Sequence, residues 1–310
     1  MIPRAPLIAA IEAGGTKFNV ALGTGPDDLR ATARIPTTTP AETMSAVLAW
    51  LSDAAREHGP FAAIGVGSFG PLELDPASPY YGYITSSPKL AWQRTDVVGP
   101  LRERFSVPVG FDTDVNAAAL GEARWGAGQG IDPLVYLTIG TGVGGGAMIN
   151  GRPLHGLLHP EMGHLQVPAA SPPGIADPRC QCPFHDSCLE GYVSGPAIAA
   201  RWGAAAETLP AGHPAWQDAA ETLARGLVSI ITILSPRRII LGGGVMHGPG
   251  VLAAVRTAVL QQLNGYLQIG SLLDDIEHYI TAPGLGDRAG VLGAIALGQQ
   301  ALAPPSGTSA

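Results

Sequence analysis

The segment LVYLTIGTGVGGG, residues 134–146, indicates both the fold class and the kind of ligand. Its first part, Leu134–Ile139, is apolar and rich in β-branched residues, which predicts a buried strand. Its second part, Gly140–Gly146, predicts a glycine-rich turn. Glycines have no Cβ atom, so backbone N–H groups in such a turn can approach phosphate oxygens. A strand followed by this turn is typical of α/β proteins that bind a phosphorylated nucleotide.

Two further groups of polar residues follow this segment. Glu161 and His164 lie three positions apart, so they would be neighbours on a helix. A cluster with the spacing of metal ligands comes next, and the candidates are His164, Cys180, Cys182, His185 and Cys188. Tetrahedral zinc needs four ligands, so one candidate is superfluous, and we expect it to be Cys180. The alternative is a set of small buried cysteines beside a surface histidine.

The composition is that of a globular protein. The chain has 310 residues, of which 46% are hydrophobic and 14% charged, with a formal net charge of −7. This acidic balance, without a basic block, argues against nucleic acid and anionic membranes as partners. No apolar run reaches transmembrane length and the N-terminus lacks a signal-peptide pattern, so we expect a cytoplasmic protein. In that compartment the three clustered cysteines favour a metal site over a disulfide.

A second strand and glycine turn lie at the N-terminus. We expect Leu7–Glu12 to be a buried strand and Phe18–Gly23 its hairpin partner, and the tip consists of Gly14, Gly15, Thr16 and Lys17. The tip could be an ordinary β-turn with glycines for positive φ. In the functional interpretation, its amides, the Thr16 hydroxyl and the Lys17 ammonium face a phosphate. Glu12, beside this turn, could hold Mg²⁺ through water.

The other elements follow from hydrophobic periodicity. We expect strands at residues 29–36, 62–68, 107–111, 237–244 and 277–282. We expect helices from residue 39 or 40 to about 58 and at residues 96–105, 115–125, 194–202, 214–235, 249–264 and 288–301. The repeated strand and glycine turn predicts two related α/β halves around a cleft, with a boundary near residues 120–130. Residues 72–94 lack periodicity, and their SSPKLAWQ segment either covers a substrate or is a plain surface loop.

Acidic residues at a strand end give the candidate catalytic group. Asp112–Asp114 ends a predicted strand and begins the helix Val115–Trp125, which is where α/β folds place their sites. These residues could instead cap the helix, and one can cap while its neighbour acts. Asp114 is our candidate base for phosphoryl transfer, which needs positioning, Mg²⁺ and a proton acceptor. The glycines at 242–244 could accept a flat nucleoside.

Together these motifs resemble the ROK family of sugar kinases, and within it the bacterial fructokinases. The resemblance covers nearly the whole chain. The motifs are IEAGGTK at 11–17, DTDVNAAALGE at 112–122, LTIGTGVGGG at 137–146, HPEMGH at 159–164, CPFHDSCLEG at 182–191 and ILGGGVM at 240–246. None of them is specific alone, but the combination is.

The resemblance implies an α/β fold of the actin-like ATPase (ribonuclease H-like) class, with two domains around a central cleft. The small α/β domain would contain residues 1–122, with the terminal helix 288–302 packed back on it. The large α/β domain would contain residues 123–287 and the zinc segment, and residues 303–310 would be a disordered tail. The resemblance also implies ATP, Mg²⁺, structural Zn²⁺ and a homodimer.

The resemblance also implies roles for individual residues. Asp114 would be the catalytic base. The residues that it places at ATP are Gly14, Gly15, Thr16, Lys17, Thr141, Gly142, Pro196, Gly242, Gly243 and Gly244. Those that it places at the sugar are Thr113, Glu161, His164 and Glu190. The zinc ligands that it implies are His164, Cys182, His185 and Cys188.

The implied activity is ATP-dependent phosphorylation of D-fructose at the 6-hydroxyl. Most glucose-type members have Asn where this chain has Thr113, at a position that touches sugar hydroxyls, so fructose is favoured over glucose. The zinc segment of glucose-type members reads CxCGxxGC, and this chain departs from that pattern. The alternatives are a broad-specificity hexokinase acting on glucose or mannose and a non-catalytic sugar-sensing regulator. A DNA-binding repressor of this family would carry an N-terminal helix-turn-helix domain, whereas only six residues precede the first predicted strand.

Overall fold

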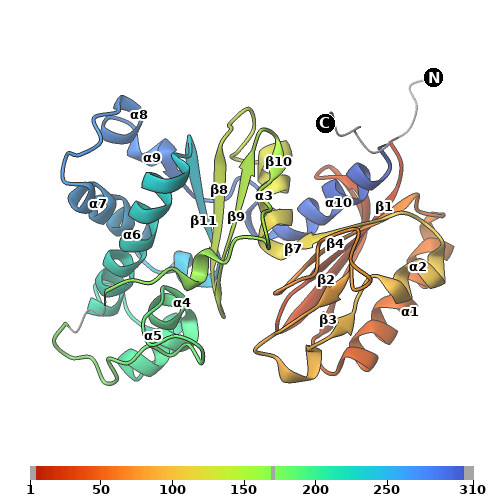
Figure 1. The fold of residues 1–310 in the computed structure, drawn as a ribbon, viewed down its shortest axis with the longest axis horizontal. Coiled ribbons are helices and arrows are strands. Elements are labelled where there is room, and N and C mark those ends of the chain that lie inside the picture. The colour runs from red at the N-terminus through yellow and green to blue at the C-terminus, as the bar shows by residue number, and fades with distance from the viewer. Residues whose placement is uncertain (1–4, 169–171, 304–310) are drawn as a thin grey trace. The chain divides into compact units, whose positions relative to one another are not determined.

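The computed structural model describes residues 5–168 and 172–303 (Figure 1). The chain forms two compact units: unit 1 comprises residues 1–126, 155–159 and 288–310, and unit 2 comprises residues 127–154 and 160–287. Residues 155–159 therefore group with unit 1, although the sequence-based division assigned them to the other domain. Apart from Ala303, the tail predicted to be disordered lies outside the described residues.

Unit 1 is built on a mixed five-stranded sheet in the order β3-β2-β1-β4-β7. The strands are β1 (Ile8–Ala13), β2 (Lys17–Gly25), β3 (Asp28–Pro36), β4 (Ala63–Ser68) and β7 (Val109–Thr113). β1, β2 and β3 pair as an antiparallel meander, whereas β1, β4 and β7 run parallel. The carboxyl ends of the three parallel strands therefore meet at one edge of the sheet.

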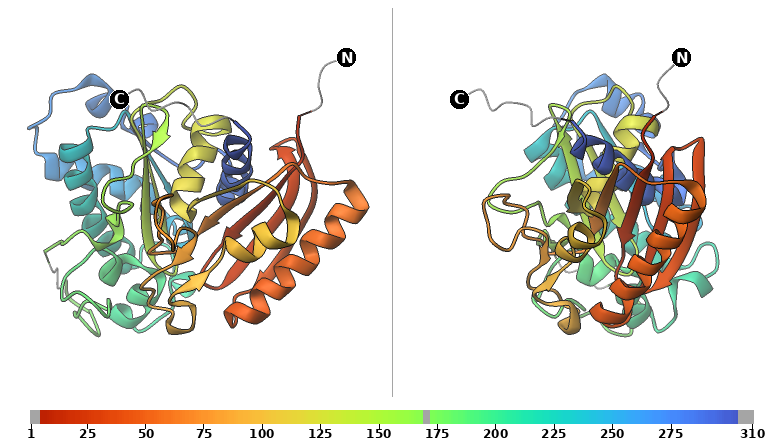
Figure 2. Two further views of the ribbon diagram at one scale, coloured as in Figure 1. Left: turned by 45° about the vertical axis from the view of Figure 1, so that its right-hand side comes forward. Right: turned by 90° about the vertical axis from the view of Figure 1, so that its right-hand side faces the viewer.

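Helices cover both faces of this sheet, as Figure 2 shows. They are α1 (Pro40–His58) on one face, α3 (Asp114–Trp125) and α10 (Ala289–Ala301) on the other, and the short α2 (Gly99–Phe105). α10 packs on α3 and β4 at very close range because glycines lie at the crossings. A Cβ atom at Gly65 would lie 1.7 Å from Ala294 O, and one at Gly293 would lie 1.8 Å from Ala117 O.

The segment without periodicity, residues 72–94, has little regular structure of its own. It contains β5 (Tyr83–Ile84), which pairs with β6 (Thr95–Asp96), and the single helical turn η1 (Leu90–Trp92). Trp92 is buried and anchors this turn, since its Nε1 donates to Thr38 O at 2.9 Å.

Unit 2 is built on a second five-stranded sheet in the order β10-β9-β8-β11-β12. The strands are β8 (Leu134–Ile139), β9 (Val143–Ile149), β10 (Arg152–Pro153), β11 (Arg238–Gly242) and β12 (Ile280–Thr281). The predicted turn Gly140–Gly146 is too long, because Gly144–Gly146 pair with β8 as part of β9. Pairing across the sheet outweighs the low strand propensity of glycine, and the turn is confined to Gly140–Gly142.

The helices of the second half pack around this sheet. They are η2 (Met162–His164), α4 (Glu190–Val193), α5 (Gly195–Trp202), η3 (Ala206–Thr208), α6 (Pro214–Leu234), η4 (Gly244–His247), α7 (Val251–Leu263), α8 (Gly270–Leu273), α9 (Ile276–Tyr279) and η5 (Gly286–Arg288). The strand predicted at residues 277–282 is too long: α9 occupies its first part, and only Ile280 and Thr281, which form β12, pair with β11. No helix within the described ranges is long and apolar enough to cross a bilayer.

Candidate active site and metal cluster

The carboxyl edge of the unit 1 sheet gathers the predicted acidic groups and the first glycine turn. In the strand register, Glu12 lies opposite Gly67, and Gly67 lies opposite Asp112. The turn Gly14–Thr16 follows β1, and Asp114 begins α3 directly after β7. Residues more than ninety positions apart are thus brought to one edge, as parallel α/β sheets do with their sites.

The first glycine turn leaves two backbone donors available. Gly14 N donates to Lys17 O at 3.0 Å, which closes the turn. Thr37 fastens it from outside, because its hydroxyl donates to Gly14 O at 2.8 Å and its amide to Thr16 O at 3.0 Å. Within the described ranges, no acceptor is bonded to the N–H groups of Gly15 and Thr16. The turn can therefore offer both donors to an anion.

Asp112, Thr113 and Asp114 have different environments. Asp112 is buried, and it accepts from the Thr113 amide at 2.7 Å and from Asn116 Nδ2 at 2.8 Å. Thr113 is the N-cap of α3: its hydroxyl oxygen accepts from Asn116 N, and its side chain is only 4% exposed. The sugar contact implied for Thr113 stays a prediction, and its capping leaves the hydroxyl hydrogen for such a contact. Asp114 is not the cap.

The ionisation of Asp114 is perturbed. Burial, and secondarily the nearby Glu12 carboxylate, raises the pKa of Asp114 from 3.8 to about 6. Glu12 is itself oriented by Asn19, whose Nδ2 donates to Glu12 Oε2 at 2.8 Å. A carboxylate with a pKa near the working pH is suited to accepting a proton in the transition state.

The short segment 155–159 is bound to unit 1 through two histidines. His155 Nε2 lies 3.0 Å from Asp112 Oδ2, and this hydrogen bond raises the pKa of His155. His159 Nε2 accepts from Leu72 N at 3.0 Å, in a buried position. The sequence did not predict these two contacts, because each histidine is far from its partner in the chain.

The second glycine turn joins three elements of unit 2. Gly140 N donates to Gly142 O at 2.8 Å and closes the turn. Glu190, the first residue of α4, accepts from Val143 N at 2.9 Å. Gly195 N donates to Gly140 O at 2.8 Å, so the N-terminus of α5, with Pro196 in its first turn, adjoins the turn. The positive end of a helix beside such a turn favours phosphate binding.

The third glycine run lies at the same sheet edge as the second. Gly242 ends β11 and pairs with Thr138 of β8, so the segments that follow the two strands are neighbours. Gly243 has a φ of 93°, and a Cβ atom there would lie 2.4 Å from Ile139 O, so only glycine fits. A Cβ atom at Gly244 would meet no atom within 4 Å, which leaves open space beside the backbone.

The predicted pair of Glu161 and His164 lies at the single helical turn η2. The turn is closed by His164 N, which donates to Glu161 O at 2.9 Å. Glu161 is exposed, whereas the His164 imidazole points towards the cysteines. The structure therefore brings His164 to the candidate metal site, and its sugar contact and that of Glu161 stay predictions.

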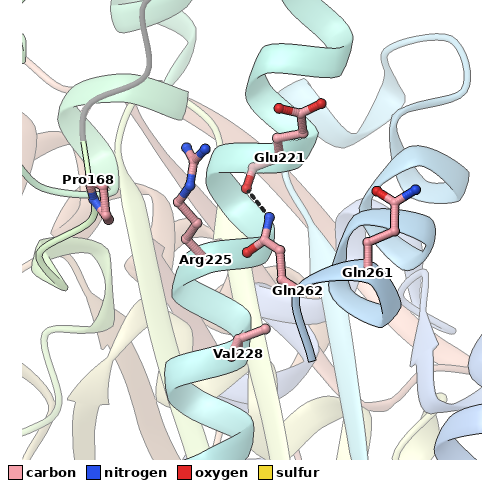
Figure 3. A pocket seen from close by; sticks show the side chains of 6 residues that line it. All are labelled: Pro168, Glu221, Arg225, Val228, Gln261 and Gln262. Carbon is pink, nitrogen blue, oxygen red and sulfur yellow. Dashed lines mark hydrogen bonds between the residues drawn. The ribbon is translucent and has the colours of Figure 1, made fainter. Parts of the chain in front are cut away.

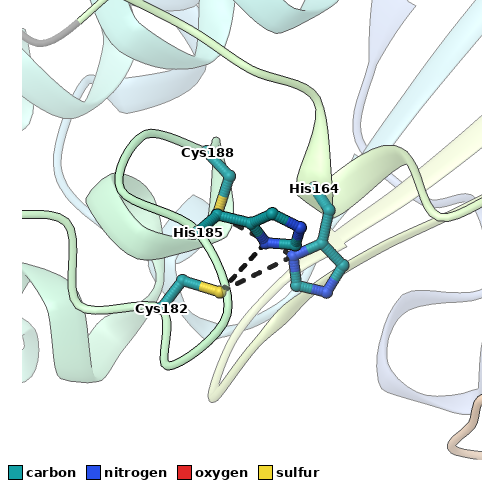
Figure 4. A group of neighbouring side chains, drawn as sticks. All are labelled: His164, Cys182, His185 and Cys188. Carbon is teal, nitrogen blue, oxygen red and sulfur yellow. Dashed lines mark hydrogen bonds between the residues drawn. The ribbon is translucent and has the colours of Figure 1, made fainter.

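Four side chains of unit 2 converge as a metal site would require (Figure 4). The ligand atoms of His164, Cys182, His185 and Cys188 all lie within 4.8 Å of one another. Cys182 Sγ is 3.9 Å from His164 Nδ1 and 3.3 Å from His185 Nδ1. Cys188 Sγ is 3.8 Å from His164 Nδ1. Ligand atoms of tetrahedral zinc are separated by roughly 3.3–3.8 Å, so this set of two imidazoles and two thiols fits the ion.

Cys180 lies beside this cluster and is not part of the four-residue group. Its Sγ is 3.9 Å from Cys188 Sγ and packs on Gly191, where a Cβ atom would come within 2.0 Å of the sulfur. Burial, together with the neighbouring cysteines, raises the pKa of the Cys188 thiol to about 12. A coordinated cation has the opposite effect on a thiol.

Comparison with known proteins agrees with these motifs. The family model described as "ROK family" matches residues 8–301. The chain belongs to the ROK family. It is 46% identical over 296 residues to the fructokinase of Zymomonas mobilis, covering 94% of this chain and 96% of that protein. It is 42% identical over 296 residues to a putative fructokinase of Bacillus subtilis, covering 96% of both.

A solved ROK structure confirms the fold class. The ROK family glucokinase of Streptomyces griseus, in complex with glucose and AMPPNP, superposes with a TM-score of 0.75 at 25% identity. The match covers 95% of this chain and 99% of that one. The predicted actin-like ATPase fold of the ROK sugar kinases is therefore the fold of this chain.

One hollow of this chain is lined by none of the predicted site residues (Figure 3). It is an open depression of about 590 Å³ on the surface of α6 and α7. Its lining residues are Pro168, Glu221, Arg225, Val228, Gln261 and Gln262. A hydrogen bond from Gln262 Nε2 to Glu221 O, at 2.9 Å, ties the two helices together there. This hollow has no part in the candidate site.

Proposed function

We propose that this protein is a fructokinase, which transfers the γ-phosphoryl group of ATP to the 6-hydroxyl of D-fructose. Its fructokinase relatives support the sugar and the reaction. The observation in the molecule itself that carries the proposal is Asp114, a carboxylate at the edge of the unit 1 sheet with a pKa raised to about 6.

Asp114 is the proposed general base. Its neighbour Thr113 caps α3 and leaves Asp114 free of that task. At neutral pH a carboxylate with this pKa is mostly ionised, yet basic enough to take the proton of the attacking hydroxyl. The sugar oxygen then attacks the γ-phosphorus, the proton passes to Asp114, and ADP leaves with the electrons of the broken P–O bond.

The proposed phosphate contacts come from both glycine turns. Gly14, Gly15, Thr16 and Lys17 provide amides, a hydroxyl and an ammonium, and Thr141 and Gly142 provide the same kinds of neutral donor. The nucleoside would lie against Gly242–Gly244, with Pro196 nearby. Glu12 would hold Mg²⁺ through water, because a carboxylate oxygen is the ligand that this ion prefers, and the ion would neutralise phosphate charge.

The proposed sugar contacts are Thr113, Glu161, His164 and Glu190. Glu161 and His164 would depend on a bound zinc ion, since His164 both closes η2 and lies in the cluster with Cys182, His185 and Cys188. In this proposal zinc is structural: four protein ligands close a tetrahedral site and leave no position for substrate. Zinc would thus fix the shape of the η2 turn.

The test is release of ADP from Mg·ATP with fructose, glucose, mannose and N-acetylmannosamine. Native protein is compared with Asp114→Asn and with Asp53→Asn, which removes an exposed carboxylate of α1 as a matched control. We expect turnover on fructose that is retained by Asp53→Asn and reduced at least about 10³-fold by Asp114→Asn.

Other outcomes discriminate between the alternatives. Similar turnover of all the hexoses would contradict the fructose assignment and support a broad hexokinase. Sugar binding without turnover would support a sugar-sensing regulator. A homodimer, which the resemblance implies, is tested separately by sedimentation velocity.

A further inference from the structure

Lysine is confined to one place in this molecule. The sequence contains two lysines, Lys17 and Lys89, whereas sixteen arginines supply the rest of its permanent positive charge. Lys17 belongs to the first glycine turn. Lys89 is seventy-two positions away in the segment that sequence reasoning left open between a substrate cover and a plain loop.

The structure places Lys89 on the first glycine turn. A Cβ atom at Gly15 would lie 2.8 Å from Lys89 Cε and 3.7 Å from Lys89 Nζ. The lysine stem therefore occupies the space that a side chain at Gly15 would need, and the ammonium lies beside the turn. Any other residue at position 15 would push Lys89 away.

Lys89 is held there by the fold of its own loop. Its amide donates to the hydroxyl of the buried Ser87 at 3.2 Å. Three residues on, Trp92 is buried against Phe18, with ring centroids 5.4 Å apart. Phe18 directly follows Lys17 in β2, so this aromatic contact fixes the loop against the strand that carries the other lysine.

The two ammonium groups have no anionic partner in the part of the chain that the structure describes. No carboxylate lies within 4.0 Å of either as an ion pair, and neither donates a side-chain hydrogen bond there. The amides of Gly15 and Thr16 are available at the same turn. The Lys89 ammonium and two free N–H donors lie at one turn, whose next residue is Lys17, and together they make a site for a multiply charged anion.

We propose that Lys89 is a further catalytic residue of the proposed kinase, and that its ammonium binds the phosphoryl group in transfer together with Lys17. In the reaction a bond forms between the sugar oxygen and the γ-phosphorus, and the bond from that phosphorus to the β–γ bridging oxygen breaks. The proton goes to Asp114, and ADP leaves. Lys89 is neither donor nor acceptor of that proton; it neutralises charge on the equatorial oxygens.

Lys89→Met tests the charge, because methionine keeps an unbranched stem over Gly15. Its matched control is Arg94→Met, which removes a positive charge from an exposed residue of the same loop. We expect kcat to fall about 10²-fold in Lys89→Met with little change in the KM for fructose. Arg94→Met should keep the native kcat, and Lys89→Arg should recover part of the loss.

A direct measurement uses the scarcity of lysine. Reductive methylation with ¹³C-formaldehyde labels the two lysines and the N-terminal amine and keeps their charge, so NMR sees one resonance for each. Lys17→Arg and Lys89→Arg assign the resonances. We expect the Lys89 resonance of the native protein to shift on titration with fructose 6-phosphate, and with inorganic phosphate at higher concentration.

Three results would overturn the proposal. The first is an unchanged kcat in Lys89→Met, and the second is an equal loss of kcat in Arg94→Met. The third is a Lys89 resonance that does not shift with either phosphate ligand while the Lys17 resonance does. The inference rests on the proposed function for the identity of the reaction. If native protein fails to phosphorylate fructose, that function fails, while the inorganic phosphate titration still decides whether Lys89 binds the anion.

Discussion

Nε2 of His155 lies 3.0 Å from Oδ2 of Asp112, so this carboxylate is paired, whereas Asp114, two residues on, forms no ion pair with any residue that the structure describes. The other oxygen of Asp112 accepts from Asn116 Nδ2 and from the Thr113 amide. An aspartate bonded in this way serves structure. Burial raises the pKa of Asp114, which has no cationic partner among the described residues, and this suits that residue to chemistry.

Asp114→Asn should stabilise the protein at high pH while abolishing turnover. The native pKa of about 6 lies above the ordinary 3.8, so the folded state binds the proton more tightly than the unfolded state. Stability from this group is therefore complete below about pH 4 and is lost as the pH rises to about 6. Urea unfolding at about pH 8 should show Asp114→Asn more stable by roughly 1–3 kcal/mol.

That gain should vanish near pH 4, where native Asp114 is already protonated. Asp53→Asn, in an exposed position, should show no such pH dependence. A gain for Asp114→Asn that is the same at both pH values would mean that the pKa of Asp114 is ordinary. In kinetics, kcat/KM of the native enzyme should fall on the acid side with an apparent pKa of about 6.

Zinc binding should require Cys182 and should not require Cys180. Purified protein should contain one zinc per chain, and Cys182→Ser should lose it, because Cys182 Sγ faces two imidazole nitrogens. Cys180→Ser, which changes the neighbouring sulfur outside the group, should keep it. Elemental analysis measures the metal, and the melting temperature with and without chelator measures its effect on folding.

The two cysteine variants are matched in chemistry and differ in position. Equal zinc content in both would contradict the ligand set. Loss of zinc from Cys180→Ser alone would exchange the roles of the two residues. Retention of the native melting temperature after complete metal removal would contradict a structural role for the ion.

Removing one partner of the ion pair between Arg201 and Asp218 should strongly destabilise the protein, whereas replacing both partners with apolar residues should not. Arg201 is 0% exposed, donates to Asp218 at 2.9 Å and to Pro178 O at 3.2 Å, and stacks on Tyr192. Asp218→Ala leaves a buried charge unpaired, so it should lower the free energy of unfolding by about 3–5 kcal/mol.

The contrast is the exposed pair of Arg179 and Asp177, where the arginine side chain is 83% exposed. Arg179→Ala should change stability by less than about 1 kcal/mol. Replacing both buried partners, as Arg201→Met with Asp218→Leu, should recover much of the loss from Asp218→Ala. Urea unfolding measures all three, and a small effect of Asp218→Ala would contradict the burial of this pair.

The attachment of segment 155–159 should strengthen at low pH. The hydrogen bond to Asp112 raises the pKa of His155 above its unfolded value, so its stabilisation is complete below about pH 6.5 and is lost as the pH rises through the folded pKa. His155→Gln should therefore destabilise the protein more at about pH 6 than at about pH 9. If His155→Gln destabilises the protein equally at both pH values, His155 and Asp112 do not form a charged pair.

Local patterns explain what the sequence could predict. Alternating and continuous apolar runs located most strands and the long helices, and the helix predicted at residues 40–58 is α1. The metal cluster was predictable because three of its ligands lie within seven positions. By contrast, β9 runs through three glycines of low strand propensity, and only its pairing with β8 makes it a strand.

Contacts between distant segments escaped prediction. His155 and Asp112 are 43 positions apart, and no periodic signal joins them. Lys89 lies in a loop whose shape is set by the burial of Trp92, which the sequence does not reveal by spacing. The sequence allowed Asp112, Thr113 or Asp114 to cap α3. Only the backbone conformation of the structure identifies Thr113 as the cap.

The composition of unit 1 from three stretches of chain has a consequence for its synthesis. Residues 1–126 are synthesised before residues 160–287, yet α10, which packs on α3 and β4, is synthesised only after them. Until then the glycine-lined surface around Gly65 has no helix to cover it. Residues 1–126 must therefore remain incompletely folded until α10 has been synthesised, and a nascent chain that stalls before Ala289 is a natural client for chaperones.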